Sequence, residues 1–275
     1  MYRRCVKKLA AGAFFGAAEA QWRTGLATLT SLRHDAARIV PEHAHERAFL
    51  TLLLAGRYRE RVGGHEIDYS ILDLVFHPEG LVHSDEIGAG GARFFTVELA
   101  PEAFRHLGRD GTRLVGTRDV SGGALVWRAL SLLWLCLAAP TDGLAIEEGI
   151  ADLLERLREN AGRRASAASW LARVDDVLRA RFREGVSLSD LAATAGVHPV
   201  HLSQAYRRAR GCTLSRAVQR LRVREACRLI EGGAALSEAA QGAGFVDHSH
   251  LTAVFRRLSG STPSAVRRLL RAPVP

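Results

Sequence analysis

Leu188-Ser189-Asp190-Leu191-Ala192 is matched 48 residues later by Leu236-Ser237-Glu238-Ala239-Ala240, and this repeat decides the fold of the C-terminal region. Ala195-Gly196 and Ala243-Gly244 keep the same spacing. One residue is then inserted, and the spacing becomes 49 for three further pairs: His201-Leu202 with His250-Leu251, Tyr206-Arg207-Arg208 with Phe255-Arg256-Arg257, and Gly211 with Gly260. A repeat of this length defines one supersecondary building unit.

Each copy has the pattern of a helix-turn-helix unit. Ser187 and Asp190 form an S-x-x-D start that resembles a capping box, and Gly196 and Gly244 end the first helix of each unit. The second helix has apolar residues at i and i+4 on one face, and its other face is polar and ends in an arginine pair. The predicted buried residues are Leu202, Tyr206, Leu251 and Phe255.

One continuous helix is predicted between the units, from Leu214 to Glu231. At about 1.5 Å per residue it is roughly 27 Å long, close to the ~34 Å between successive turns of the major groove. Two units held at that distance can therefore read DNA. The alternative is a helical scaffold that binds protein.

The charge distribution favours DNA. The 275 residues are 47% hydrophobic and 24% charged, and no apolar stretch is long enough to span a bilayer. From Ser166 onward there are 17 arginines, no lysine and 8 acidic residues, whereas residues 1–165 contain 21 basic and 21 acidic residues. The net charge of +9 therefore belongs to the C-terminal region, as expected of a nucleic-acid-binding domain. A basic face can also serve a membrane surface or solubility.

The cysteines and the N-terminus indicate a cytoplasmic protein that does not bind membranes. Cys5, Cys136, Cys212 and Cys227 lie far apart, which is typical of reduced thiols. Residues 3–20 superficially resemble a signal peptide, but their apolar part is short and contains two glycines. We interpret this segment as an arm that leads into a first strand.

Residues 170–270 resemble the DNA-binding domain of AraC/XylS-family transcription regulators. The motifs that carry the resemblance are residues 187–192, 196–203, 222–229, 243–251 and 260–267. Val266 departs from the family pattern, which usually has an aromatic residue there. The resemblance implies base contacts from Val200, His201, Ser203, Gln204, Asp247, His248, Ser249, His250 and Thr252. It assigns phosphate contacts to Arg207, Arg208, Arg256, Arg257 and Arg267.

The N-terminal part has a different pattern. Residues 23–99 alternate Val and Ile with polar residues between turn signals at Gly56, 63–64, 78–80, Gly88 and 90–91, which predicts an antiparallel barrel or sandwich. Helices are predicted over 125–139 and 146–157. The second resembles the part that these regulators use to dimerise; the alternative is an ordinary helix packed on the barrel. We predict a sensing domain over 1–159, a linker over 160–169 and the DNA-binding domain over 170–275.

Two stretches, 41–45 with Gly56 and 78–83, resemble the half-motifs of a cupin barrel, a sensor domain often found in such regulators. In metal-binding cupins an H-x-H pair, a Glu and a later His hold one ion. Here Phe49 and Leu50 occupy the approximate place of the Glu, and Glu46 points the other way on a regular strand. We therefore predict an organic effector pocket and no metal or other cofactor. Its lining is His43, His45, Tyr58, His77 and His83, and the alternative is a metal held by His43, His45 and His83.

The function predicted from these features is that of a sequence-specific transcription regulator without catalytic activity. Its expected partners are double-stranded DNA, a small-molecule effector, a second copy of the chain and RNA polymerase. The alternative is a metal-dependent cupin sensor or enzyme fused to a DNA-binding module.

Overall fold

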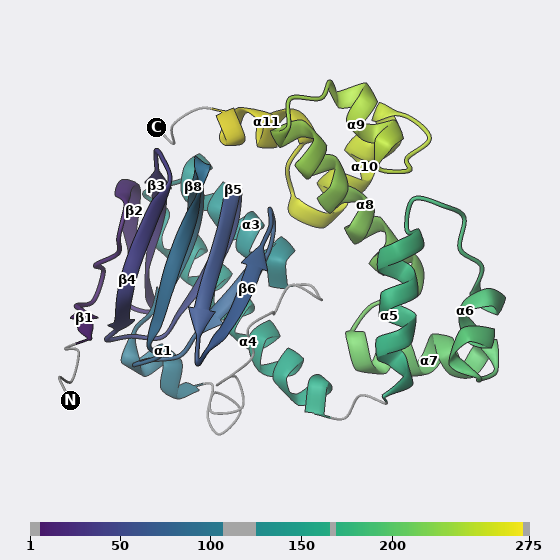
Figure 1. Ribbon diagram of the computed structural model, residues 1–275, viewed down its shortest axis with the longest axis horizontal. Helices are drawn as coiled ribbons and strands as arrows, with labels where there is room; N and C mark the ends of the chain where they lie inside the picture. The colour runs from purple at the N-terminus through teal and green to yellow at the C-terminus, as the bar shows by residue number, and fades with distance from the viewer. Residues whose placement is uncertain (1–5, 107–124, 166–168, 272–275) are drawn as a thin grey trace. The chain divides into compact units, whose positions relative to one another are not determined.

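The computed structural model describes residues 6–106, 125–165 and 169–271, which divide into a strand-rich unit and a helical unit (Figure 1). The described part of the first unit is residues 6–106 and 128–155, and that of the second is 125–127, 156–165 and 169–271. The division thus falls inside a helix, a few residues before the end of the predicted sensing domain.

Eight strands among the described residues form the sheet of the first unit. The two longest, β5 (Phe49–Val62) and β8 (His83–Leu99), pair along most of their lengths. On its other edge, β8 pairs with β4 (Arg38–His45) through its N-terminal part and with β3 (Ala27–His34) through its C-terminal part. Strand β3 pairs in turn with β2 (Ala17–Arg23). The other edge of β5 pairs with β6 (His65–Tyr69) and β7 (Leu74–His77). Every pairing is antiparallel except that of β1 (Lys7–Leu9) with β4, so the predicted antiparallel architecture is confirmed.

Two glycines allow β5 and β8 to bend where they cross. Gly56 has φ 85° and Gly91 has φ 74°, and the register between the strands shifts around Gly56. A Cβ atom on Gly56 would lie 2.1 Å from the carbonyl oxygen of Gly91, so no other residue fits there. The predicted turns at Gly56, Gly88 and 90–91 are wrong, because these glycines lie inside β5 and β8. The predicted turns at 63–64 and 78–80 are confirmed.

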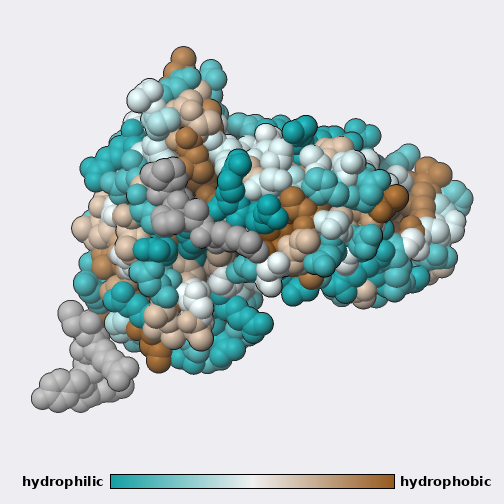
Figure 2. Space-filling model, turned by 90° about the horizontal axis from the view of Figure 1, so that it is seen from above, coloured by the Kyte–Doolittle hydropathy of each residue, from teal (hydrophilic) through white to brown (hydrophobic). Residues whose placement is uncertain are grey.

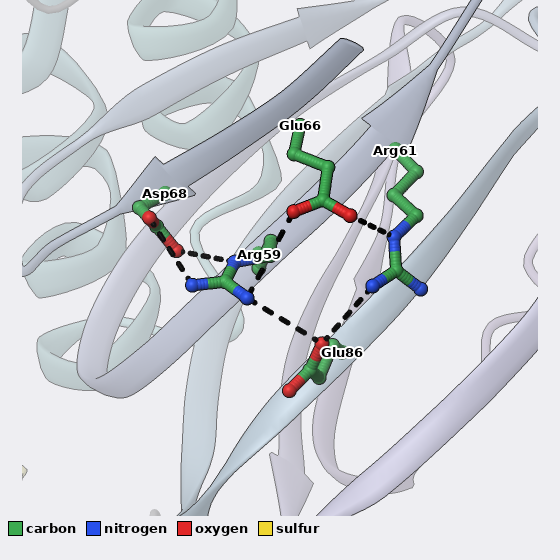
Figure 3. A network of polar contacts seen from close by, with 5 residues as sticks. All are labelled: Arg59, Arg61, Glu66, Asp68 and Glu86. Atoms are coloured by element: carbon green, nitrogen blue, oxygen red, sulfur yellow. Dashed lines mark hydrogen bonds and ion pairs between the residues drawn. The ribbon is translucent and has the colours of Figure 1, made fainter. Parts of the chain in front are cut away.

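The end of β5 separates a polar outer face from the interior. Arg59 and Arg61 point outward and pair with acidic residues of β6 and β8, as Figure 3 shows. The shortest contacts join Arg59 Nε to Asp68 Oδ1 (2.7 Å) and Arg61 Nε to Glu66 Oε1 (2.6 Å). Because side chains alternate along a strand, Tyr58 and Glu60 point into the unit, where both are buried.

In the part of the chain that the structure describes, the sheet is followed by α1 (Pro101–His106), α3 (Leu125–Ala138) and α4 (Gly143–Ala165). The apolar α3 ends one residue before its predicted end, and α4 buries Ile146, Ile150, Leu153 and Leu157, the expected apolar stripe. The predicted linker over 160–169 overlaps this helix, because the backbone stays helical to Ala165. Alanine and arginine, abundant there, are good helix formers.

The second unit begins with the first residues of α3 and the end of α4, and the helices that follow match the repeat. They are α5 (Trp170–Arg181), α6 (Leu188–Ala195), α7 (Pro199–Arg210), α8 (Leu214–Glu231), α9 (Leu236–Gly242), α10 (His248–Ser259) and α11 (Pro263–Arg271). All four residues predicted to be buried in the repeats are buried, and α8 has the predicted bounds. Val266, the departure from the family pattern, is also buried.

Most of the surface seen in Figure 2 is hydrophilic, with hydrophobic residues in separate patches. Among the described residues, no helix has the length and apolar character needed to cross a membrane. The described cysteines, Cys136, Cys212 and Cys227, are buried free thiols.

Candidate nucleic-acid interface and histidine cavity

The first helix-turn-helix unit is fixed by local caps. Ser187 Oγ accepts a hydrogen bond from the Asp190 amide at 3.0 Å and starts α6, as predicted. Gly196 ends α6 with φ 67°. His198 Nδ1 then accepts from the Val200 amide at 3.3 Å, with Pro199 as the first residue of α7. This histidine cap was not predicted, because histidine is not among the usual N-cap residues.

In the second unit, carboxylates take the capping positions. Glu238 Oε2 accepts from the Ala235 amide at 2.9 Å at the start of α9, and Asp247 Oδ1 accepts from the His250 amide at 2.7 Å at the start of α10. Gly244, in the turn between them, has the predicted positive φ, 83°. Asp247, predicted as a base-reading residue, thus already has a structural role.

The residues predicted to read bases lie at the N-terminal ends of α7 and α10. All are exposed except Thr252, which is half-buried. Two of them also pack on aromatic neighbours: His201 lies 5.9 Å from the Trp170 ring, and His250 lies edge-on to Phe245 at 5.3 Å. The two helix ends therefore present polar side chains that the fold leaves accessible.

The arginines predicted to contact phosphates differ in their surroundings. Arg207, Arg208 and Arg256 are exposed and Arg267 is half-buried, and none of the four forms an ion pair with another described residue. Arg257 donates to Gln219 Oε1 at 3.0 Å. The unpaired guanidinium groups remain available for an anionic partner.

Other arginines of the same unit are structural, which the sequence did not reveal. Arg210 donates to Asp175 Oδ2 of α5 from Nε at 3.0 Å and from Nη2 at 2.6 Å. Arg222 Nε donates to the Phe182 carbonyl at 2.7 Å. These side chains join elements far apart in sequence, so local spacing gives no signal for them.

A cavity of about 50 Å³ lies inside the first unit, between the bent strands. All five residues predicted as pocket lining surround it: His43 and His45 from β4, Tyr58 from β5, His77 from β7 and His83 from β8. The remaining walls are mostly apolar and aromatic, formed by Phe14, Phe15, Leu32, His34, Val40, Phe49, Thr51, Asp85, Ile87, Phe94 and Thr96.

Hydrogen bonds orient three of the four histidines that were predicted to line the cavity. His43 Nδ1 lies 3.0 Å from the Pro41 carbonyl, and His83 Nδ1 lies 3.1 Å from the Leu81 carbonyl. A carbonyl can only accept, so these nitrogens carry the proton and each Nε2 keeps a lone pair. His77 Nε2 lies 3.0 Å from Glu60 Oε1. The four rings are neighbours, with the His43 and His83 centroids 4.2 Å apart and those of His77 and His83 5.0 Å apart.

Two carboxylates in this region were not predicted, Glu60 and Asp85. Glu60 accepts from His77 and from the Tyr69 hydroxyl at 3.1 Å. Asp85 accepts from the Tyr58 hydroxyl at 3.0 Å, and its oxygens lie 3.8 Å from His43 Nε2 and 4.0 Å from His83 Nε2. Alternation along β5 places Glu60 on the same face as Tyr58, which was predicted to line the pocket, so this signal was available.

Burial governs the electrostatics of the cavity. It lowers the pKa of His45 to about 2 and that of His83 to about 3, with the other histidines adding to both shifts, and it lowers the pKa of His43. Burial raises the pKa of Asp85 to about 7. For Glu60, burial opposes ionisation, but attraction by His77 and its hydrogen bond prevail and lower the pKa to about 2.

The donor set fits a metal ion. One nitrogen each of His43, His45 and His83 lie within 4.8 Å of one another, and the same holds for donor atoms of Glu60, His77 and His83. Uncharged imidazoles with a fixed tautomer are the form that binds transition metals. The sequence argument against a metal was the missing carboxylate, and Glu60 supplies one from β5.

A sequence profile described as a helix-turn-helix domain matches residues 191–269. These residues are an AraC-type helix-turn-helix domain. The chain is 34% identical over 79 residues to the HTH-type transcriptional regulator GlxA of Rhizobium meliloti, covering 28% of this chain and 24% of GlxA. The bifunctional transcriptional activator/DNA repair enzyme AdaA of Bacillus subtilis is 24% identical over 103 residues, 37% of this chain and 49% of AdaA. The chain thus matches half or less of each of these relatives.

The similarity of the chain to solved structures is low by TM-score. The DNA-binding domain of AdpA, solved with a target DNA, has 29% identity and a TM-score of 0.35, covering 38% of this chain and 97% of that one. ToxT from Vibrio cholerae has 9% identity and a TM-score of 0.39, covering 90% of this chain and all of that one. Scores below 0.5 do not establish a shared overall fold, so the assignment of the AraC-type domain depends on the match to residues 191–269.

Proposed function

We propose that this protein is a sequence-specific transcription regulator, in which the AraC-type domain reads double-stranded DNA and a ligand in the histidine cavity modulates that binding. The observation that carries the proposal is the pair of helix-turn-helix units, α6–α7 and α9–α10, each presenting an accessible helix end beside unpaired arginines. The names of the relatives, a transcriptional regulator and a transcriptional activator, support it.

The proposed division of labour follows the two units. Residues 1–159 sense the ligand and 170–275 bind DNA, with base contacts from the starts of α7 and α10 and phosphate contacts from the arginines that follow. We also propose that the protein is a cytoplasmic homodimer joined through α4 and that it acts on RNA polymerase. We assign no catalytic step to the cavity.

Selection of duplexes from random DNA by the full chain tests the proposal directly. We expect a preferred, asymmetric site for each chain, because the two helix ends carry different residues. Binding to that site, measured by fluorescence anisotropy, falls steeply with salt, since each phosphate neutralised contributes about −0.9 to the slope of log K against log salt.

Matched arginine variants sharpen this test. Arg207→Gln and Arg256→Gln each reduce the salt slope by about 1 and weaken binding to all sequences alike. Arg179→Gln on α5, which pairs with Asp176 at 2.9 Å, is the control and leaves the slope unchanged. Absence of both sequence preference and salt dependence would show a protein-binding scaffold in place of a DNA reader.

A further inference from the structure

The arrangement of the two helix-turn-helix units depends on how each is attached to α8. Near its start, α8 packs its half-buried Leu214, Val218 and Leu221 on the core of α5, α6 and α7, and the same helix contacts α9, α10 and α11. A glycine with positive φ lies in the turn on each side of α8, Gly211 before it (66°) and Gly233 after it (98°). Because apolar packing is non-directional, the angle between the units must be set by other contacts.

Directed hydrogen bonds from α8 hold the loop that follows α5. Arg222 donates from Nε to the Phe182 carbonyl at 2.7 Å and from Nη2 to the Glu184 carbonyl at 3.1 Å. The guanidinium is a rigid planar fork, so two such bonds fix the direction of the loop relative to α8. Between these two residues, Arg183 donates to Glu225, which lies about one turn further along α8.

Glu225 is the acidic centre of this contact. Its side chain is 10% exposed, and it also accepts from Arg228, from Nε and from Nη2, at 2.8 Å in each case. The hydrogen bonds from Arg228 and Arg183 hold the pKa of the Glu225 carboxyl below its usual range, although burial opposes this shift. The carboxylate is therefore ionised at neutral pH and binds both arginines.

The turn between α9 and α10 closes against the same loop. A Cβ atom on Gly244 would lie 2.7 Å from the carbonyl oxygen of Arg183 and 2.9 Å from its Cα atom. Gly196, at the matching position of the first unit, has a similar φ, 67° against 83°, but no described atom lies within 4 Å of its Cβ position. Backbone conformation alone therefore accounts for glycine at position 196, whereas position 244 also requires glycine because a neighbouring loop approaches it.

We propose that residues 182–184, held by Arg222 and Glu225 of α8 and by the turn at Gly244, fix the orientation of the second helix-turn-helix unit relative to the first. Arg222, Glu225 and Gly244 are positioning residues, which determine the spacing and rotation of the two DNA segments that the chain accepts. The effect on DNA spacing rests on the function proposed above, whereas the fixed orientation does not.

Two spin labels test the orientation without DNA. They are placed on Ala193 of α6 and Gln241 of α9, which are exposed and occupy matching positions in the repeat. A ketone-bearing unnatural amino acid at each position carries the label, so the native cysteines are not modified. We expect pulsed electron spin resonance of the full chain to give one narrow distance distribution. Arg222→Gln and Gly244→Ala should each broaden or split that distribution.

Gly196→Ala and Arg216→Gln are the matched controls. The first imposes the same strain at positive φ with no neighbour in the way, and the second removes the same charge from α8 at an exposed position. Both should keep the wild-type distribution. Wild-type width in Arg222→Gln and Gly244→Ala, or equal broadening in the controls, overturns the proposal. If Gly244→Ala does not fold, Arg222→Gln, which creates no steric overlap, decides alone.

Duplexes of altered spacing test the consequence for DNA. One helical turn of about 34–36 Å takes about 10–10.5 base pairs, so one inserted base pair moves the second segment by about 3.4 Å and rotates it by about 35°. The selected duplex is compared by fluorescence anisotropy with one that has a base pair inserted between its two read segments. We expect the insertion to weaken wild-type binding about 10-fold or more, as a mismatched base pair does, and binding by Arg222→Gln about threefold or less.

The outcomes separate this inference from the proposed function. Arg216→Gln should show the full wild-type penalty for the insertion. An equal penalty in Arg222→Gln and the wild-type chain overturns the role in DNA spacing, while the spin-label distances still report the fixed orientation. Failure of the wild-type chain to bind any duplex contradicts the proposed function and leaves the fixed orientation to be decided by the distances.

Discussion

The two helix-turn-helix units of the C-terminal domain share one pattern but are stabilised by different interactions. In the first, Tyr206 of α7 donates its hydroxyl to Asp175 of α5 at 3.0 Å, and Arg210 binds the same carboxylate. In the second, the matching residues are Phe255, which has no hydroxyl and is fully buried, and Ser259, whose hydroxyl returns to the Phe255 carbonyl at 3.0 Å. The contacts of Tyr206 and Arg210 with Asp175 thus form a polar anchor in the first unit, whereas the buried ring of Phe255 is the apolar anchor of the second.

The residues that cap the N-terminal ends of α7 and α10 also differ between the two units. His198 and Asp247 occupy matching positions before α7 and α10, and each accepts a backbone hydrogen bond, at 3.3 Å for the imidazole and 2.7 Å for the carboxylate. The turn of the second unit is one residue longer in the repeat alignment and exposes Val246, at 81%. The two repeats therefore share the arrangement of the backbone, whereas their exposed residues differ. Under the proposed function, the two units would read different bases.

The apolar anchor gives the largest expected effect. Phe255→Ala removes a fully buried ring and is expected to destabilise the chain by about 3–5 kcal/mol, because the cavity left behind cannot be refilled by its packed neighbours. Urea unfolding followed by far-UV circular dichroism measures the loss. Phe255→Leu, which keeps most of the volume, is the control and costs less than about 1.5 kcal/mol. A similar small loss in both variants would show that this core collapses around the gap.

The polar anchor of the first unit gives the next largest effect. Asp175→Asn weakens three charge-assisted hydrogen bonds, and we expect a loss of about 1.5–3 kcal/mol in the same unfolding measurement. Tyr206→Phe removes only the hydroxyl and isolates one bond, at about 1 kcal/mol. If Tyr206→Phe cost as much as Asp175→Asn, the Arg210 contact would contribute nothing.

Sequence predicts the helical unit better than the sheet, for a physical reason. Helix ends depend on residues close in the chain, so caps such as Ser187 and the glycines at 196 and 244 place α6 and α9 well, and α8 has its predicted bounds. Glycine in a strand region has two meanings, a turn or a bend against a partner strand. Gly56 has the second because Gly91 approaches it across β5 and β8, a contact that local sequence does not encode.

The cavity shows the same limit. Alternation along β4 and the two half-motifs gather His43, His45 and His83, and all five predicted lining residues do surround one cavity. The Glu60–His77 contact was missed because it joins β5 to β7 inside the unit. Sequence spacing finds side chains on one strand, whereas partners that meet across the interior depend on the sheet as a whole.

Substitutions of exposed residues in the two units should change which bases are preferred without changing the stability of the chain. Gln204→Ala in the first unit and His248→Ala in the second change exposed side chains, so neither is expected to alter unfolding. Each should relax preference at a different position of the selected site, by about 1–3 kcal/mol of discrimination for a bidentate contact such as glutamine with adenine. Competition between variant duplexes measures the change. Unchanged preference in both variants would show that α7 and α10 are not the reading helices.

The smallest effect comes from the caps and decides the role of Asp247. Asp247→Ala leaves the His250 amide without its acceptor and should cost about 1 kcal/mol, the same as Ser187→Ala at the start of α6. Asp247→Asn restores the cap, because asparagine is an equally good N-cap residue, but it presents an amide where the carboxylate could accept from cytosine N4. Wild-type stability with altered base preference in Asp247→Asn would make Asp247 both cap and base reader. Wild-type behaviour in both measurements would leave it a cap alone, and the second unit would then read DNA with the residues from His248 onward.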